Sequence, residues 1–128
     1  MIQYSRSDLF KIGEDLAVKH LVSTGYTLVC RNYRQTYGEI DVIVEKNQRL
    51  IFCEVKTRSY HSISRALEAV SFSKQKKLTK TAQSYINQNP QFHNHQFRFD
   101  IIVVLFEPGL DIFSVKHFED AFLPVPYC

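Results

Sequence analysis

The chain has 128 residues, close to the commonest size of a single domain, so we expect one hydrophobic core across residues 1–128 and no linker. Apolar residues make up 45% and charged residues 23%, which excludes a disordered polar chain, and no apolar run reaches the ~18 residues that cross a membrane. The net charge of +3 permits a nucleic-acid partner without requiring one.

The N-terminal part of the sequence predicts one helix followed by one strand. Residues 7–24 have the pattern of a helix, with Ser7 as the expected N-cap, Asp8 in the first turn and Gly25 at the C-terminal end. Residues 26–32 then have the apolar and β-branched composition of a strand.

The rest of the chain alternates between strands and one more helix. Strands over residues 38–45 and 49–57 are joined by a tight hairpin, and a looser segment, residues 58–70, precedes a helix over residues 73–88. Asn89 and Pro90 end that helix. The last two strands are the strongly apolar residues 97–106 and a short strand around residues 112–115. The order αβββαββ predicts an α/β fold with a mixed central sheet flanked by helices.

Three cysteines are too few and too scattered for a disulfide framework or a zinc site. Cys30 and Cys53 fall in expected strands, where a thiol packs like a small apolar group. The N-terminus does not have the pattern of a secretory signal. These features predict a cytoplasmic protein.

Glu54 and Lys56 are the first residues that suggest chemistry. Because strand side chains alternate, both share the face of the apolar Phe52. A carboxylate and an ammonium group on a face that should be apolar are costly to bury. The structural alternative is a partly exposed ion pair at the end of a strand.

Asp41 interrupts the neighbouring apolar strand, and its relation to Glu54 depends on the hairpin register. A two-residue loop, Asn47-Gln48, sets Asp41 opposite Glu54, whereas a three-residue loop sets it beside Cys53 and sends Glu54 to the other face. Two facing carboxylates are unfavourable without a cation between them. Hard oxygen ligands suit Mg²⁺ or Mn²⁺. Glu39 lies on the same side and is an alternative ligand.

Glu14 is the third candidate acid. The other charged side chains of the first helix fall within an arc of roughly 80° on the helical wheel, and Glu14 lies outside it, near Phe10 and Ala17. It therefore points toward the core or its rim. The structural alternative is a carboxylate that accepts a hydrogen bond from a backbone amide. Gly13, just before it, permits the close approach of another backbone at a modest cost in helix stability.

Basic side chains surround these acids in the sequence. The set expected to contact phosphate groups is Arg31, Arg34, Arg58, Lys74, Lys76, Lys77 and Lys80. For the lysine run, a solvated helix face is an equally good interpretation.

Five further residues have a structural and a functional interpretation. Tyr33 and Tyr37 could stack on bases, although core packing is the expected fate of at least one. Asp100 is either a structural hydrogen-bonding partner or a support for the site. His93 and His95 lie in a polar loop that offers no further metal ligands.

An ordered set of short motifs resembles the bacterial YraN family over nearly the whole chain. The motifs are Gly13-Glu14-x-x-Ala17, Gly25-Tyr26, Arg31-Asn32-Tyr33-Arg34, Gly38-Glu39-Ile40-Asp41, Glu54-Val55-Lys56-Thr57-Arg58, Lys74-Gln75 and Arg98-Phe99-Asp100. That family resembles the PD-(D/E)xK nucleases, near the archaeal Holliday-junction resolvases and the restriction endonucleases. The resemblance implies a restriction endonuclease-like fold.

The resemblance also implies roles for individual residues. Asp41 and Glu54 would bind the metal, Glu14 would complete the site through water or the ion, and Lys56 would polarise the attacking water or neutralise charge on the phosphate. Gln75 resembles an accessory polar residue of some relatives. Ile40 replaces the proline that names the superfamily. Thr79 stands where some relatives place a tyrosine.

We therefore expect a Mg²⁺- or Mn²⁺-dependent endonuclease that hydrolyses the phosphodiester bonds of DNA, with branched or structured DNA suggested by analogy. RNA is the alternative substrate, and a homodimer is compatible with the sequence. The competing hypothesis is a catalytically weak or inactive module on the same fold that binds nucleic acid or docks to a partner.

Overall fold

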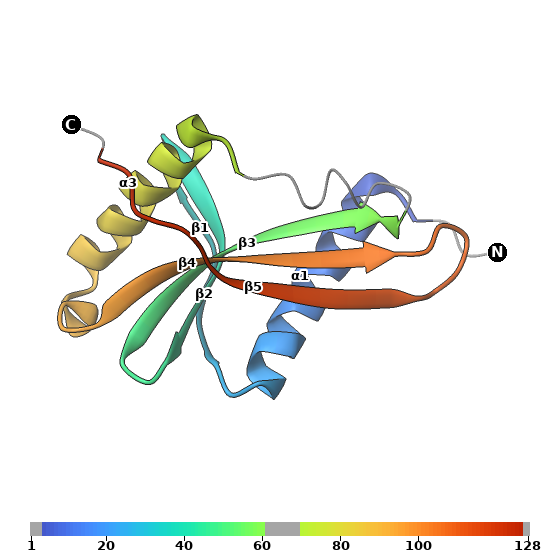
Figure 1. The fold of residues 1–128 in the computed structure, drawn as a ribbon, viewed down its shortest axis with the longest axis horizontal. Helices are drawn as coiled ribbons and strands as arrows, with labels where there is room; N and C mark the ends of the chain where they lie inside the picture. Colours follow the sequence, from blue (N-terminus) through green and yellow to red (C-terminus); the bar gives the residue numbers. More distant parts are fainter. Residues whose placement is uncertain (1–3, 61–69, 127–128) are drawn as a thin grey trace.

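A computed structural model describes residues 4–60 and 70–126 of the chain (Figure 1). The elements within these residues are α1 (Arg6–Ser23), β1 (Thr27–Gln35), β2 (Gly38–Lys46), β3 (Arg49–Ser59), α3 (Phe72–Gln88), the 3-10 helix η2 (Pro90–Phe92), β4 (Gln96–Phe106) and β5 (Phe113–Phe122). The predicted succession of helices and strands is found in this order.

The five strands form one mixed sheet in the order β1-β2-β3-β4-β5. Each neighbouring pair is antiparallel except β3 and β4, which run parallel. A parallel pair needs a crossover connection that returns the chain to the starting edge, and α3 lies in that connection. The predicted α/β class with a mixed sheet is confirmed.

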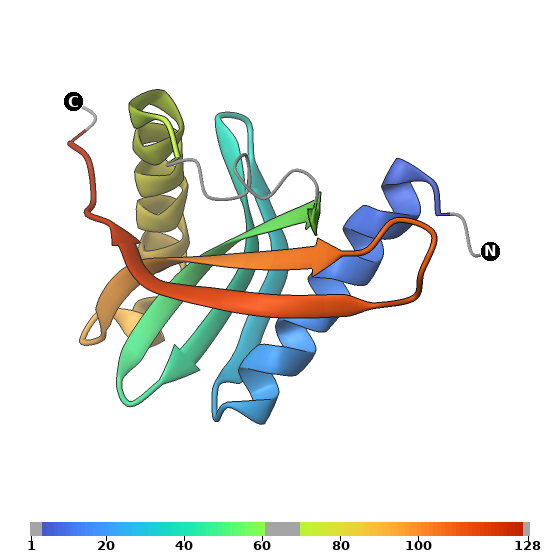
Figure 2. The ribbon, with the colours of Figure 1, turned by 45° about the vertical axis from the view of Figure 1, so that its right-hand side comes forward.

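The two α-helices of the described residues cover opposite faces of the sheet. On β3, Ile51 and Cys53 pack in the apolar cluster of α1, whereas Leu50 and Phe52 pack in the cluster of α3. This is the alternation that a strand buried on both faces must show. Figure 2 shows the strands passing between the two helices. Neither helix is long and apolar enough to span a membrane.

The β2–β3 hairpin has the two-residue loop. Lys46 pairs with Arg49, and Asn47 and Gln48 between them have φ values of 52° and 64°. Positive φ at both central residues is the geometry of a type I′ turn, whose twist matches that of the flanking strands. Of the two registers considered, this is the one that turns Asp41 and Glu54 to the same side.

Two expectations about element ends are wrong. The N-cap of α1 is Ser5 and not Ser7, because Ser5 Oγ accepts from the Asp8 amide at 3.0 Å and the Asp8 carboxylate accepts from the Ser5 amide at 3.2 Å. The last strand is longer than residues 112–115, since β5 pairs with β4 from Phe113 to Phe122. Because β5 is an edge strand, it can carry many polar residues, and these obscure the apolar pattern from which a strand is predicted.

The segment expected to be loose, residues 58–70, begins within a regular element. Arg58 and Ser59 still belong to β3, opposite Leu105 and Phe106 of β4. Residues 61–69 lie outside the described residues. Val70 is buried against the cluster of α3.

Candidate active site

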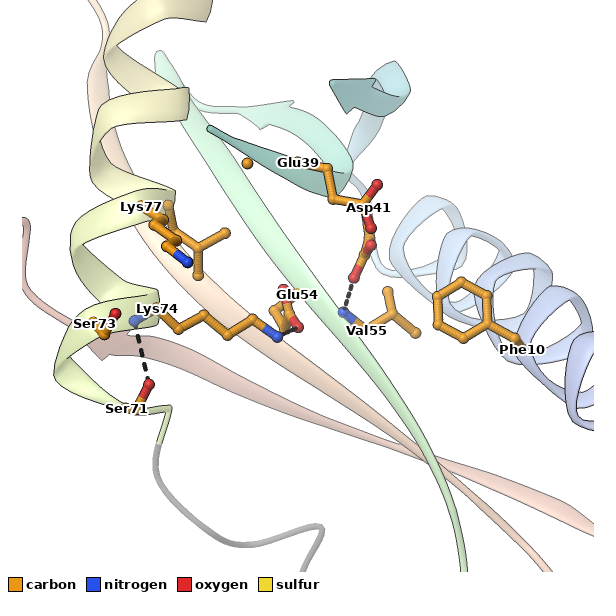
Figure 3. Close-up of a pocket in the computed structure, with 11 residues that line it drawn as sticks. Phe10, Glu39, Asp41, Glu54, Val55, Ser71, Ser73, Lys74 and Lys77 are labelled. Carbon is orange, nitrogen blue, oxygen red and sulfur yellow. Dashed lines mark hydrogen bonds and ion pairs between the residues drawn. The ribbon is translucent and has the colours of Figure 1, made fainter. Parts of the chain in front are cut away.

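A cavity of about 470 Å³ lies where β2 and β3 stop pairing. Backbone pairing between the two strands runs from Lys46–Arg49 to Val42–Cys53. The cavity beyond it is lined by residues from both helices and both strands (Figure 3), including Phe10, Glu39, Asp41, Glu54, Lys74 and Lys77. The acids come from the sheet and the lysines from α3.

Asp41 is the buried acid of this cavity, with 5% of its surface exposed. Its Oδ2 accepts a hydrogen bond of 2.8 Å from the backbone amide of Val55, as Figure 3 shows. The Asp41 carboxylate of β2 thus accepts the hydrogen bond that a backbone carbonyl would otherwise accept from this amide of β3. Burial, followed by the negative charge of Glu54, raises the pKa of Asp41 from 3.8 to about 7, although the Val55 amide acts in the other direction.

Glu54 faces Asp41 across the cavity and is paired with a lysine. Its Oε1 lies 2.5 Å from Nζ of Lys74, which reaches over from the first turn of α3. The Glu54 side chain is 11% exposed and that of Lys74 is 51% exposed. The acid is therefore held in the wall of the cavity, while the lysine lies at its rim.

Glu14 is buried as expected but lines a different hollow. It borders a neighbouring space of about 830 Å³ together with Phe10 and Arg31. Its Oε1 is buried without a hydrogen-bond partner, and Nη2 of Arg31 lies 3.7 Å from it. The hollow that Glu14 borders adjoins the cavity of Asp41 and Glu54, since Phe10 lines both. Its charge still raises the pKa of Asp41.

Gly13 explains how α1 comes so close to β3. A Cβ at this position would lie 1.9 Å from Oγ1 of Thr57, which no real contact permits. The expected close approach is made by a side chain rather than by another backbone. Thr57 Oγ1 is itself buried without a hydrogen-bond partner. A glycine here therefore brings Glu14 next to the strand that carries Glu54.

Lys56 and Gln75 lie outside the lining of the cavity. Lys56 follows Glu54 on the same strand face and is half-buried. The side-chain amide of Gln75 donates to the carbonyl of Val70 at 2.8 Å, so it fixes the chain that enters α3. Thr79 also serves the fold, because its hydroxyl accepts from the Val125 amide at 3.0 Å.

Of the basic residues expected to contact phosphate, some line the cavity and others form ion pairs or lie elsewhere. Lys74 and Lys77 line the cavity. Arg31 forms an ion pair with Asp15, at 2.8 Å, and Arg34 forms one with Glu39, at 3.1 Å.

The other three lie away from the cavity lining. Nζ of Lys80 lies 4.5 Å from the centre of the Tyr37 ring. Lys76 and Arg58 are exposed, and Arg58 donates to the Thr57 carbonyl at 2.9 Å.

Asp100 is the centre of a hydrogen-bond network, which is the structural one of the two roles expected for it. Its carboxylate accepts hydrogen bonds from Arg98 at 2.8 and 3.0 Å, from His117 at 2.6 Å and from the backbone amide of Asp120 at 2.9 Å. Although burial raises the pKa of Asp100, His117 and Arg98 hold it below the ordinary value. Asp100 thus joins β4 to β5 on the side of the sheet away from Lys74.

Tyr33, His93 and His95 have structural roles as well. The Tyr33 ring packs edge-on against Tyr85, with centroids 4.9 Å apart, and its hydroxyl bonds to α3 through Gln88. His95 pairs with Glu45. The His93 ring contacts the carbonyl of Ile86 at 3.1 Å.

No three histidine, cysteine or carboxylate side chains of residues 4–60 and 70–126 stand close enough together to hold a metal ion as they lie. The available donors nevertheless fit a hard cation. Asp41 and Glu54 border one cavity, and the unpartnered oxygen of Glu14 is close enough to influence Asp41. All three are carboxylates, the ligand type that Mg²⁺ and Mn²⁺ prefer.

Comparison with known proteins places the chain among bacterial relatives of the same length. A family model described as "Uncharacterised protein family UPF0102" matches residues 13–104. A UPF0102 protein of Dictyoglomus turgidum is 36% identical over 118 residues, covering 92% of this chain and 99% of the relative. One from Clostridium botulinum is 37% identical over 94% of this chain and 98% of the relative. One from Chloroherpeton thalassium is 41% identical over 91% and 94%. UPF0102 is the YraN family expected from the ordered motifs, so that prediction is confirmed.

Proposed function

We propose that this chain, which belongs to the UPF0102 family, is a divalent-metal-dependent endonuclease that cleaves DNA on a restriction endonuclease-like fold. The observation that carries the proposal is the pairing of Asp41 and Glu54 in one cavity with lysines at its rim. Two carboxylates that share a partly buried space repel each other, and burial followed by this repulsion raises the pKa of Asp41. A divalent cation would remove the repulsion.

The residues present would hold such an ion with oxygen ligands alone. Asp41 and Glu54 would bind it, and Glu14 would complete the site through its unpartnered oxygen. When bound, Mg²⁺ or Mn²⁺ supplies a Lewis acid for the phosphoryl oxygen and relief of the developing negative charge. The Val55 amide holds the Asp41 carboxylate in place, at 2.8 Å.

The remaining groups would act on the substrate. Lys74 and Lys77, at the rim of the cavity, would bind the phosphate backbone on either side of the scissile bond. Lys56, on the strand face of Glu54, would polarise the attacking water or neutralise charge on the phosphate. Phe10 on the opposite wall would restrict the access of bulk water. DNA is the proposed substrate, with RNA as the alternative.

The test is cleavage by the pure protein of linear, nicked, branched and single-stranded DNA and of RNA, in Mg²⁺, in Mn²⁺ and in chelator. Wild type should cut at least one DNA substrate in a metal-dependent manner, and Asp41→Asn should not. The control is Asp111→Asn, which removes an exposed carboxylate that is bonded to Tyr4 at 2.8 Å and does not line the cavity. Cleavage by Asp41→Asn at the wild-type rate would overturn the proposal.

A nucleic-acid-binding or partner-docking module is the second candidate. The observation in its favour is the ion pair between Glu54 and Lys74, which neutralises one of the two acids without a metal. Such a module would bind DNA through the lysines of α3 and would cut none of the substrates.

A further inference from the structure

The proposed metal site already contains a cation, the ammonium group of Lys74. Its Nζ lies 2.5 Å from Oε1 of Glu54, and Figure 3 shows the side chain reaching from α3 to the acid. The two partners differ in exposure, since 11% of the Glu54 side chain is exposed against 51% of that of Lys74. If the pair separates, the lysine is therefore the partner that moves into solvent.

An ammonium group and a divalent ion compete for Glu54. A carboxylate oxygen that accepts a short, charge-assisted hydrogen bond is a weaker ligand, and the lysine charge also repels an approaching dication. In the structure Glu54 is paired with Lys74, and Glu14 lies 3.7 Å from Arg31.

We propose that Lys74 is a built-in counter-ion that the divalent metal displaces from Glu54, and that the released ammonium group then binds the phosphate backbone. This inference rests on the proposed function and adds to it a coupling between metal binding and phosphate binding. Metal binding frees a phosphate-binding charge at the rim of the cavity, next to Lys77 one helical turn along α3. Because binding free energies are linked, phosphate binding in turn favours the metal.

The position of Lys74 allows its side chain to be changed without altering α3. The helix is capped by Ser71, whose hydroxyl accepts from the backbone amide of Lys74 at 3.2 Å. That bond does not involve the side chain. Lys74→Gln therefore removes the ammonium group and keeps the cap, so α3 should still form in the variant.

The first experiment measures Mn²⁺ affinity by calorimetry, without nucleic acid. Lys74→Gln should bind Mn²⁺ about tenfold more tightly than wild type, because the competing cation is gone. The matched control is Lys77→Gln, which removes the same charge from the same cavity but not the contact with Glu54. It should raise the affinity by no more than about twofold. Equal gains in the two variants, or no gain in Lys74→Gln, would overturn the proposal.

The second experiment measures binding of a single-stranded oligonucleotide in chelator. Glu54→Gln frees Lys74 without any metal, so it should tighten binding by about fivefold. The lost repulsion between carboxylate and phosphate would also tighten binding, and the double variant separates the two causes. In the Lys74→Gln background, Glu54→Gln should have little further effect. If it tightens binding equally in both backgrounds, repulsion alone is responsible and Lys74 has no such role.

Neither experiment depends on turnover, so this inference and the proposed function can fail separately. Tighter Mn²⁺ binding by Lys74→Gln with no cleavage of any substrate would leave the counter-ion role intact and overturn the nuclease. Metal-dependent cleavage by wild type, with unchanged Mn²⁺ affinity in Lys74→Gln, would support the nuclease and overturn the counter-ion role. If neither wild type nor Lys74→Gln binds Mn²⁺, the counter-ion role is wrong.

Discussion

Asp41 is the residue whose charge the fold tolerates least. Burial and the charge of Glu54 raise its pKa from 3.8 to about 7. The folded state then holds this proton more tightly than the unfolded chain does. The protonated carboxyl therefore stabilises the fold below the ordinary pKa, and this contribution is lost as the pH rises through about 7. We expect the metal-free protein to lose free energy of unfolding over that interval.

Chemical denaturation in chelator, at several pH values between the two pKa values, measures this loss. Other groups titrate in the same range, and the Asp41→Asn variant separates them because it cannot ionise at this position. Wild type should lose more stability than Asp41→Asn as the pH rises. Parallel curves for the two proteins would show that the Asp41 carboxyl is not in the buried, repelled state described.

The sequence limited the relation of Asp41 to Glu54 to two registers, because both of its determinants are local. Side-chain alternation sets the face of each residue, and the length of the turn sets the register. The partners of the charged groups are not local in this sense. Arg31 beside Glu14 and Lys74 beside Glu54 depend on where two helices pack on the sheet, which no periodicity in their own segments encodes.

At the scale of elements, the packing of α1 on β3 depends on the missing side chain of Gly13. A Cβ there would lie 1.9 Å from Thr57 Oγ1, so Gly13→Ala must push the helix and strand apart. We expect a loss of about 1–3 kcal/mol in the free energy of unfolding, the usual cost of overpacking. The shift would also move Glu14 away from Asp41.

Denaturation of the double variant tests the cause of that loss. Thr57→Ala removes the atom that the new Cβ would meet, so part of the stability lost in Gly13→Ala should return in Gly13→Ala/Thr57→Ala. Additive losses would show that the cost of Gly13→Ala arises elsewhere.

The contact between β4 and β5 depends on a second acid, Asp100, which is fully buried beside Arg98 and His117. Asp100→Asn leaves the largely buried guanidinium of Arg98 with only the exposed Glu119 carboxylate, 3.9 Å away, as a counter-charge. We expect a loss of about 3–5 kcal/mol in the free energy of unfolding. Under conditions where the variant is folded, its Mn²⁺ affinity should equal that of wild type. A selective loss of Mn²⁺ affinity with normal stability would instead assign Asp100 to the metal site.

The ends of helices and strands were predicted correctly where a few consecutive residues specify a turn or the end of a helix. Asn89 and Pro90 end α3 at Gln88, as expected. The prediction failed for β5, because an edge strand with one exposed face can carry many polar residues, such as Lys116 and Asp120, and still pair along its length with β4.

At the scale of the whole molecule, the layered fold brings together groups that lie on opposite faces of the sheet. Phe10 of α1 and Lys74 of α3 border the same cavity, because the sheet opens where the pairing of β2 and β3 ends. The acids lie in this opening and the lysines extend along α3 from it. Under the proposed function, a nucleic-acid strand would be held by α3 and cut at the opening.

Variants of this arrangement can distinguish an enzyme from a binding module, because the loss of a lysine weakens DNA binding whereas the loss of an acid removes cleavage. Lys77→Ala should weaken DNA binding in chelator for every sequence. Each lost phosphate contact should reduce the slope of log affinity against log salt by about 0.9 on duplex DNA. Lys76→Ala and Lys80→Ala, which remove exposed lysines outside the cavity lining, should have the smaller effects.

Substitutions at the acids and at Lys56 should leave binding and remove chemistry. Glu54→Gln keeps the shape of the side chain and removes a ligand charge, so cleavage in Mn²⁺ should collapse while binding in chelator persists or tightens. Lys56→Met should lower the cleavage rate by ~10² or more, because the cation that stabilises the phosphoryl charge is gone. Gel-shift affinity in chelator and cleavage in Mn²⁺, measured on the same preparations, give both readouts. If wild type cuts no substrate with either metal while the Lys77 variant loses binding as expected, the chain is a binding module, and the acids of the cavity serve the fold alone.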